Sequence, residues 1–114
     1  EPVGAALAPL LQAARWRAPR LPYLPNVLGA IEPAPTPARL VELLTLHVYR
    51  PVLWRASIEA ALRRYPDATF VEVGPRAVLH NLLTKRWVSA KRLRTDLDTP
   101  DHYDALAKEL CGSL

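Results

Sequence analysis

Proline residues divide this chain into short segments and limit the length that any helix or strand in it can reach. There are 12 prolines among the 114 residues. Because proline has no backbone N–H and fixes its own φ, the interior of a helix or of a central strand rarely accommodates it. We therefore expect short elements that begin or end close to the prolines.

Apolar residues at helical spacing predict five helices between these breaks. The expected helices cover residues 3–19, 37–50, 51–65, 78–87 and 100–111. Pro9 falls inside the first of them, so that helix is expected to kink or to begin later. Threonine-proline pairs at 36–37 and 99–100 suit a helix start, because the threonine oxygen caps free amides and proline fits the first turn.

Two short extended segments accompany these helices. The run from Thr69 to Val73 is rich in β-branched and aromatic residues and lies between turn-forming pairs, so it is the clearest strand. The segment 21–24 is also expected to be extended, because residues that precede proline avoid the α conformation. The resulting order is helix, strand, two helices, strand and two helices, which is typical of an α/β fold.

A sheet of this size is incomplete. Two strands separated by helices form at most a two-stranded parallel ladder, whereas parallel sheets normally contain more strands and are covered on both faces. The expected fold is therefore α/β, with an incomplete parallel sheet and flanking helices, and we expect the chain to be part of a larger fold or assembly. A small independent domain with an irregular sheet is the alternative.

Composition favours a packed, cytoplasmic protein that binds neither nucleic acid nor a membrane. Hydrophobic residues make up 50% of the chain and charged residues 23%, close to the values of globular proteins. No apolar run is long enough to cross a bilayer, and no basic region followed by an apolar stretch opens the sequence. Cys111 is the only cysteine, so an internal disulfide is excluded and no zinc site is expected.

Charge is weakly informative, because 15 basic residues stand against 11 acidic ones and the formal net charge is +4. One local basic cluster lies in the second half of the chain, without intervening acidic residues. It comprises Lys85, Arg86, Lys91, Arg92 and Arg94. The cluster is expected to be a solvated face or, alternatively, a contact for an acidic partner. Aromatic residues do not alternate with these bases as they do in a nucleic-acid platform.

The sequence lacks the motifs of a self-sufficient enzyme. A nucleophilic serine needs a tight turn built from nearby glycines, and no serine here has such surroundings. There is no phosphate-binding glycine loop, and no pair of carboxylates is spaced for acid–base catalysis. Glu72 lies in a strand expected to be covered, where a hydrogen-bonded structural carboxylate is favoured over a catalytic one. Structural roles are also expected for His80 and His102, and an inert or exposed thiol for Cys111.

Three blocks of the sequence resemble one known family. They are Pro22-Tyr23-Leu24-Pro25-Asn26-Val27, Tyr49-Arg50-Pro51-Val52-Leu53-Trp54, and Phe70-Val71-Glu72-Val73-Gly74-Pro75 followed by Val78-Leu79. Together with the intervals between them, these blocks resemble the malonyl-CoA:acyl carrier protein acyltransferase family, which includes the acyltransferase domains of polyketide synthases. The resemblance covers residues 1–87 and corresponds to less than half of such a domain.

The resemblance implies that this chain is the C-terminal part of the family's large, α/β-hydrolase-like subdomain. Residues 1–94 would belong to that subdomain, and residues 95–114 would form a C-terminal helix or the start of a linker that follows the acyltransferase domain. The family's nucleophilic serine lies in an earlier Gly-His-Ser-x-Gly motif, and its catalytic histidine lies just upstream of the position of Glu1. Both would lie outside this chain, which alone is expected to be inactive.

In bacterial relatives, a main-chain carbonyl near the start of the Pro-Val-x-Trp block holds the catalytic histidine. The aligned residue here is His47, and the resemblance implies this role for its carbonyl, not for its imidazole. Asn26 is a candidate for structural support of the same neighbourhood. No residue of this chain is expected to bind a cofactor or a metal, and the arginine that pairs with the acyl group's carboxylate belongs to the missing part.

The implied activity is a ping-pong transfer in polyketide or fatty acid biosynthesis. Serine takes a malonyl-type acyl group from coenzyme A and passes it to the phosphopantetheine thiol of an acyl carrier protein, while histidine moves the protons. The expected partners are the N-terminal portion of the same acyltransferase and the carrier protein. There are two alternatives: a noncatalytic module that docks the acidic carrier protein through the cluster at 85–94, and an acyl hydrolase of the same fold.

Overall fold

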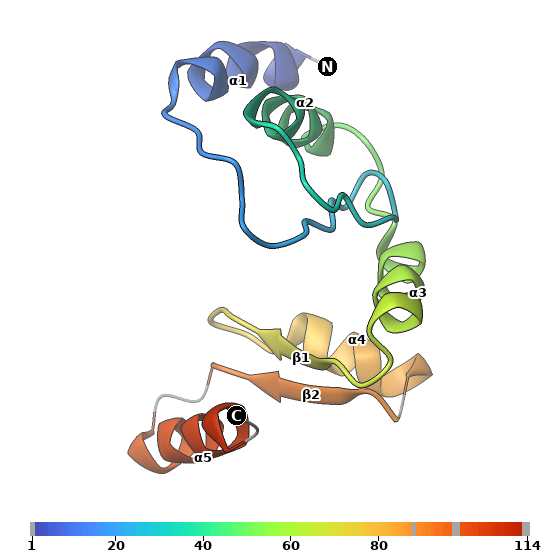
Figure 1. Cartoon of the computed structure of the whole chain (residues 1–114), viewed down its shortest axis with the longest axis vertical. Coiled ribbons are helices and arrows are strands. Elements are labelled where there is room, and N and C mark those ends of the chain that lie inside the picture. The colour runs from blue at the N-terminus through green and yellow to red at the C-terminus, as the bar shows by residue number, and fades with distance from the viewer. Residues whose placement is uncertain (1, 88, 97–98, 113–114) are drawn as a thin grey trace. The chain divides into compact units, whose positions relative to one another are not determined.

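The computed structural model of the chain describes residues 2–87, 89–96 and 99–112 (Figure 1). In these residues it is a mixed α/β structure with five helices and two strands. The elements are, in order, α1 (Pro2–Ala13), α2 (Pro37–His47), α3 (Trp54–Arg64), β1 (Thr69–Glu72), α4 (Val78–Arg86), β2 (Lys91–Arg94) and α5 (Pro100–Cys111). They separate into two compact units, Glu1–Pro66 and Asp67–Leu114. The division expected at residue 94 concerns a larger domain and stays a prediction.

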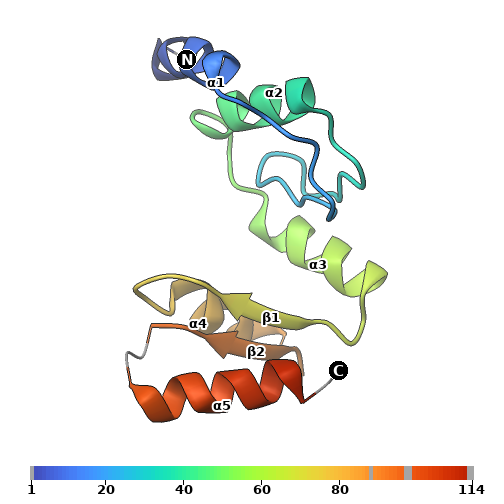
Figure 2. The ribbon, with the colours of Figure 1, turned by 60° about the vertical axis from the view of Figure 1, so that its left-hand side comes forward.

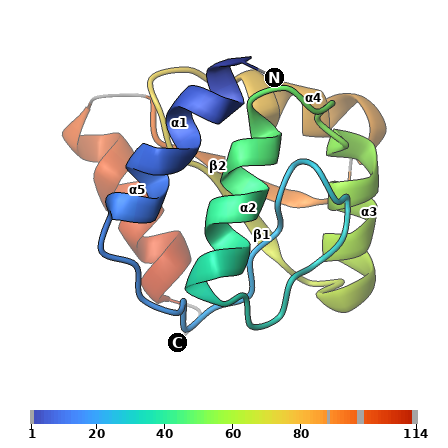
Figure 3. The same ribbon diagram turned by 90° about the horizontal axis from the view of Figure 1, so that it is seen from above.

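In the first unit, α1 and α2 pack side by side and run in opposite directions (Figures 1 and 3). Near the start of α1, a Cβ added at Gly4 would lie 2.9 Å from the Tyr49 ring and 3.4 Å from the Thr45 carbonyl oxygen. Glycine at this position therefore allows the close approach of the two helices. The start of α1 lies beside the end of α2.

The two threonine-proline helix starts are confirmed. The Thr36 hydroxyl oxygen accepts a hydrogen bond from the Arg39 amide at 3.2 Å at the start of α2. The Thr99 hydroxyl oxygen accepts one from the His102 amide at 3.3 Å at the start of α5. Each oxygen satisfies one of the amides that a helix leaves without a partner in its first turn.

Two helix boundaries differ from the expectation. The first helix runs through Pro9 and ends at Ala13, not near Pro19. At its end, the Leu11 carbonyl oxygen accepts the Ala14 amide at 3.2 Å and the Trp16 indole N–H at 2.6 Å. The third helix begins at Trp54 instead of residue 51, and the Leu53 amide just before it donates to the Asn26 carbonyl oxygen.

The expectation of a strand within 21–24 is wrong. This segment forms only one antiparallel bridge, in which Tyr23 and Glu32 exchange backbone hydrogen bonds of 2.9 and 2.8 Å. Pro25, two residues after Tyr23, has no N–H with which the ladder could continue in that direction. The second strand is instead β2, which falls within the basic cluster, where the sequence patterns predict no strand.

The second unit is built on the parallel pair β1–β2. The register places Thr69 opposite Lys91 and Glu72 opposite Arg94. Helix α4 connects the two strands and packs against both of them, and α5 lies on their other side (Figure 2). The strand expected at Thr69–Val73 is thus confirmed, and so is a two-stranded parallel sheet with flanking helices.

The hydrophobic core of the described residues is small. Its buried members are Leu43, Ile58, Ala77, Leu83 and Leu106. Large apolar side chains are exposed on β1, just after it and on α4, namely Val71, Val73, Val78, Leu79 and Leu82. Since β1 and β2 pair only with each other in the part of the chain described, each strand also has one edge without a neighbour.

Replacing Leu43 by alanine is expected to destabilise the first unit. Leu43 is 1% exposed, so the substitution leaves a cavity and should lower the free energy of unfolding, measured in urea, by about 2–5 kcal/mol. Leu10→Ala is the matched control, because Leu10 is 70% exposed and should change that free energy by about 0.5 kcal/mol or less. Equal effects of the two variants would contradict the core described above.

Candidate functional site

His47 is the last residue of α2, and its carbonyl group points out of the helix end. The final turn directs the Arg50 amide to the Leu46 oxygen at 2.9 Å and the Val48 amide to the Thr45 oxygen at 3.4 Å. The amide that would reach the His47 oxygen belongs to the residue four positions later. That residue is Pro51, which has no N–H. Among the described residues, no backbone amide donates to the His47 oxygen.

A hollow of about 370 Å³ opens between α1 and α2, and His47 is one of its lining residues. It is lined by Leu7, Leu11, Leu44, His47 and Val48. Every lining residue except His47 is apolar, and His47 is exposed. The C-terminal end of α2 thus combines an accessible imidazole, a carbonyl without a backbone donor and an apolar surface.

Asn26 contacts this helix end from a different part of the chain. Its side-chain Nδ2 donates a hydrogen bond of 2.8 Å to His47 Nε2. Its carbonyl oxygen accepts the Leu53 amide at 2.7 Å. Figure 3 shows the loop that carries Asn26 between α2 and the start of α3. The structure therefore brings together the two residues of the first unit that the sequence singled out.

The loop between α2 and α3 exposes apolar side chains. They are Val48, Tyr49, Val52 and Leu53, which are 38 to 54% exposed. Val52 and Leu53 also line a hollow of about 600 Å³ along the first turns of α3. An exposed apolar patch of this kind is typical of a surface that another polypeptide or a ligand covers.

Glu72 has a structural role, as expected. Its carboxylate accepts the Leu79 amide at 3.1 Å and the His80 amide at 2.7 Å. These amides belong to the first turn of α4, whose preceding residue Ala77 has no side-chain oxygen to cap them. A carboxylate also suits the positive end of a helix. The strand thus caps the helix that follows it.

The basic cluster of the second unit is partly neutralised within the chain. Both carboxylate oxygens of Asp96 accept hydrogen bonds from the Arg94 guanidinium, the one from Nη2 at 2.6 Å. Arg92 is half-buried and donates to the Ala90 oxygen at 3.1 Å. Lys85 and Lys91 are exposed. A role of the cluster in carrier-protein contact stays a prediction.

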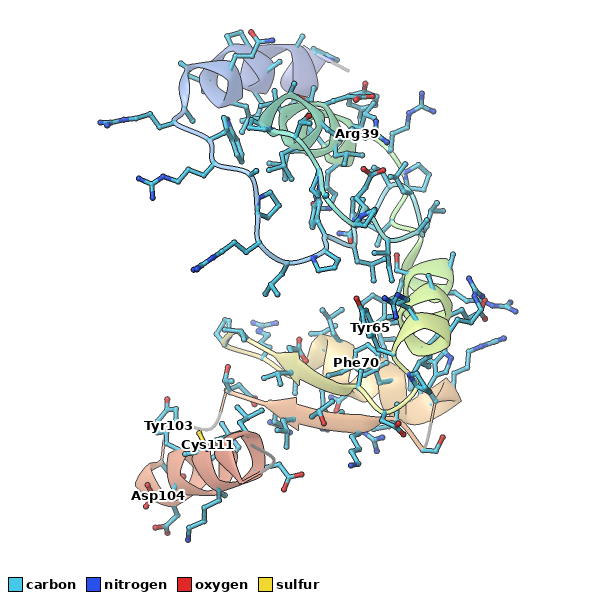
Figure 4. The ribbon with its side chains drawn as sticks, in the orientation of Figure 1. Arg39, Tyr65, Phe70, Tyr103, Asp104 and Cys111 are labelled. Atoms are coloured by element: carbon cyan, nitrogen blue, oxygen red, sulfur yellow. The ribbon has the colours of Figure 1, made fainter. Side chains whose placement is uncertain are left out.

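His102, Cys111 and His80 lie in the second unit. His102 Nε2 donates to the Arg94 carbonyl oxygen at 2.7 Å, which ties α5 to the end of β2. Cys111 is exposed in the last turn of α5, and Figure 4 labels it together with Tyr103 and Asp104, which lie toward the other end of the same helix. His80 contributes its backbone amide to the cap described above.

The lack of a backbone donor to the His47 carbonyl could have been predicted from the sequence but was not. Pro51 stands four residues after His47, and this spacing alone marks a carbonyl that no helical amide can reach. The contacts of Asn26 with His47 and Leu53 have no such signal, because they join positions 21 and 27 residues apart in the chain.

Comparison of the chain with known proteins identifies no family. No protein-family model, curated protein or solved structure matches the chain. Within the described residues, no helix is long and apolar enough to cross a membrane. Those residues also contain no group of three or more histidine, cysteine or acidic side chains arranged to hold a metal ion.

Asp96 is expected to make the second unit sensitive to acid. Its hydrogen bonds from Arg94 hold the pKa of this carboxyl below its ordinary value of 3.8. A lowered pKa in the folded state stabilises the fold above the ordinary value, and the stabilisation is lost as pH falls through the lowered one. Asp96→Asn should therefore lower the urea midpoint near neutral pH, and the gap to the wild type should close below pH 3.8.

Asp104→Asn serves as the control for this titration. Asp104 is an exposed carboxylate of α5, so the variant should follow the wild type across the same pH range. A gap between Asp96→Asn and the wild type that is independent of pH would show that the ion pair does not carry the effect.

Proposed function

We propose that this chain is the C-terminal portion of an acyltransferase of the malonyl-CoA:acyl carrier protein type. In this proposal it forms one end of an α/β-hydrolase-like sheet in a cytoplasmic enzyme of polyketide or fatty acid biosynthesis. The nucleophilic serine and the catalytic histidine are supplied by polypeptide that precedes α1. The chain contributes the His47 carbonyl to their site.

One observation carries the proposal. The start of α1 lies beside the end of α2, where Gly4 approaches Tyr49 and Thr45. A segment that leads into α1 therefore arrives next to the His47 carbonyl. The resemblance puts the catalytic histidine in that segment, and Pro51 leaves the carbonyl without a backbone donor. The helix end thus offers the acceptor that the family's histidine needs, at the place where that histidine would arrive.

In this proposal the His47 carbonyl orients the catalytic histidine. A histidine whose Nδ1–H donates to a fixed oxygen is held in one tautomer, and its Nε2 is then free to accept a proton. That nitrogen takes the proton of the serine hydroxyl while the serine oxygen attacks the thioester carbonyl. The proton passes to the departing coenzyme A sulfur, and an acyl-serine ester is left.

The second half of the reaction reverses these roles. The phosphopantetheine thiol of the carrier protein gives its proton to the same nitrogen and attacks the acyl-serine ester. The histidine then returns the proton to the serine oxygen as the ester bond breaks. A main-chain oxygen suits the orienting role because it keeps its position and its charge through both halves of the cycle.

Strand edges without a partner and exposed apolar side chains support the proposal that further polypeptide packs against this chain. The unpaired strand edges of β1–β2 and the exposed valines 71 and 73 are features of a sheet that continues. The loop between α2 and α3 likewise exposes apolar side chains beside the candidate site. Folded domains usually bury such surfaces against a partner.

Acyl-enzyme formation tests the proposal directly. The chain alone should form no covalent acyl adduct with malonyl-CoA, whereas the chain joined to the portion that precedes it should form one, detected by mass spectrometry. The adduct should pass to an acyl carrier protein faster than to water. Robust labelling of the isolated chain, or no labelling of the joined protein, would contradict the proposal, and release mainly to water would favour a hydrolase.

Pro51→Ala tests the His47 carbonyl. Alanine restores an amide four residues after His47, and its hydrogen bond to the His47 oxygen would compete with the catalytic histidine. In the joined protein, kcat for acyl transfer should fall about tenfold or more while KM stays the same, because the group acts on orientation and not on substrate binding. The fold should keep its stability, since the variant adds a hydrogen bond.

Pro66→Ala is the matched control. Pro66 stands four residues after Leu62, at the end of α3, so the same substitution also restores an amide there. No role in the reaction is assigned to the Leu62 carbonyl, so kcat should equal that of the wild type. A Pro51→Ala variant as active as Pro66→Ala would remove the His47 carbonyl from the mechanism.

A further inference from the structure

The loop of residues 48–53 between α2 and α3 is held at both ends by one residue. At its beginning, Asn26 Nδ2 donates to His47 Nε2 at 2.8 Å. At its end, the Leu53 amide donates to the Asn26 carbonyl oxygen at 2.7 Å. Asn26 therefore fixes both the helix end that carries the His47 carbonyl and the point where the chain enters α3.

The backbone of Asn26 has its own support, independent of the side chain. Pro25 is one of the most completely buried residues, and its carbonyl oxygen accepts the Leu28 amide at 3.2 Å in a turn. The turn ends at Gly29, whose φ is +60°, a conformation that glycine adopts without strain. A Cβ at Gly29 would lie only 2.6 Å from the Ala56 Cβ. This turn is pressed against the first turns of α3.

A rigid turn with a short side chain is suited to positioning. The Asn26 side chain has two torsion angles, and its main chain is held by packing on one side and by the Leu53 amide on the other. Its amide nitrogen donates to Nε2 of the neutral His47 ring, so the ring proton lies on Nδ1. The imidazole of His47 is thus held in one tautomer and one orientation.

We propose that Asn26 is a positioning residue for the acyltransferase reaction, which it serves by holding His47 through the imidazole so that the main-chain carbonyl of His47 stays in place. This role rests on the acyltransferase function proposed above. The imidazole of His47 then fixes the helix end through its hydrogen bond with Asn26. The carbonyl of His47 accepts the hydrogen bond of the catalytic histidine. Neither Asn26 nor the His47 ring takes part in proton transfer.

Asn26→Leu is the informative substitution, because leucine has nearly the same size and no hydrogen-bonding group. In the chain alone, nitrogen NMR should show the wild-type His47 ring with its proton on Nδ1 and the variant ring as a mixture of tautomers. Exchange protection of the Leu53 amide should persist in the variant, since its partner is a main-chain oxygen. That protection also reports that the turn still folds.

In the joined protein, the same variant should lower kcat for acyl transfer about tenfold or more with an unchanged KM for malonyl-CoA. The double variant Asn26→Leu/His47→Leu should be no slower than His47→Leu alone, because both changes remove one interaction. Asn26→Asp should restore most of kcat, since its carboxylate accepts a hydrogen bond from His47 Nε2–H. A structural role alone would not produce this pattern.

Asn81→Leu is the matched control. Asn81 is exposed on α4 and its Oδ1 lies 3.4 Å from Nδ1 of the adjacent His80, so the same change is made beside another histidine. It should leave both the His47 ring signals and kcat unchanged. The Asn26 proposal is overturned if Asn26→Leu keeps the wild-type kcat, if its ring signals match the wild type, or if losses in the double variant add.

Failure of this proposal is distinguishable from failure of the proposed function. If the wild-type joined protein forms no acyl-enzyme, the acyltransferase function is wrong and the role of Asn26 falls with it. If the wild type forms the acyl-enzyme and Asn26→Leu transfers the acyl group at the same rate, only the positioning role is wrong. Should Asn26→Leu fail to fold, His47→Leu removes the same hydrogen bond and should lower kcat by the same factor, whereas Asn26→Asp should keep most of kcat.

Discussion

The organisation of the candidate site depends on a hydrogen bond that Pro51 cannot make. A helix ends with carbonyl groups that need partners from elsewhere, and at His47 the nearest possible backbone donor is replaced by a ring nitrogen without a proton. The oxygen is therefore held in a fixed direction by α2 and stays open to a partner. The antiparallel packing of α1 against α2 determines which part of the polypeptide can approach it, because the start of α1 lies at this same end.

Both units also leave many large apolar side chains exposed to solvent. The hydrophobic core of the described residues has few members, while the β1 strand and α4 expose valine and leucine side chains. A parallel pair of strands normally lies within a larger sheet covered by helices. In the proposed acyltransferase, the portion that precedes this chain would supply the remaining strands of that sheet.

The sequence predicted features whose signals are local. Thr36 and Thr99 precede prolines and cap their helices, and the β-branched run at 69–72 forms a strand. Strand β2 could not be predicted this way, because three of its four residues are Lys or Arg and only pairing with β1 makes the segment extended. The contact between Asn26 and His47 likewise follows from the path of a turn, not from any spacing in the sequence.

The carboxylate of Glu72 has a consequence for how the second unit opens. It lies on a strand but closes the first turn of the following helix, and the main-chain oxygen of the same residue accepts the Thr95 amide at 3.1 Å. Fraying of α4 and separation of the two strands thus share one residue and should occur as a single cooperative event. Amide-exchange rates at positions 79 and 80 would consequently report on the integrity of the sheet as much as on the helix.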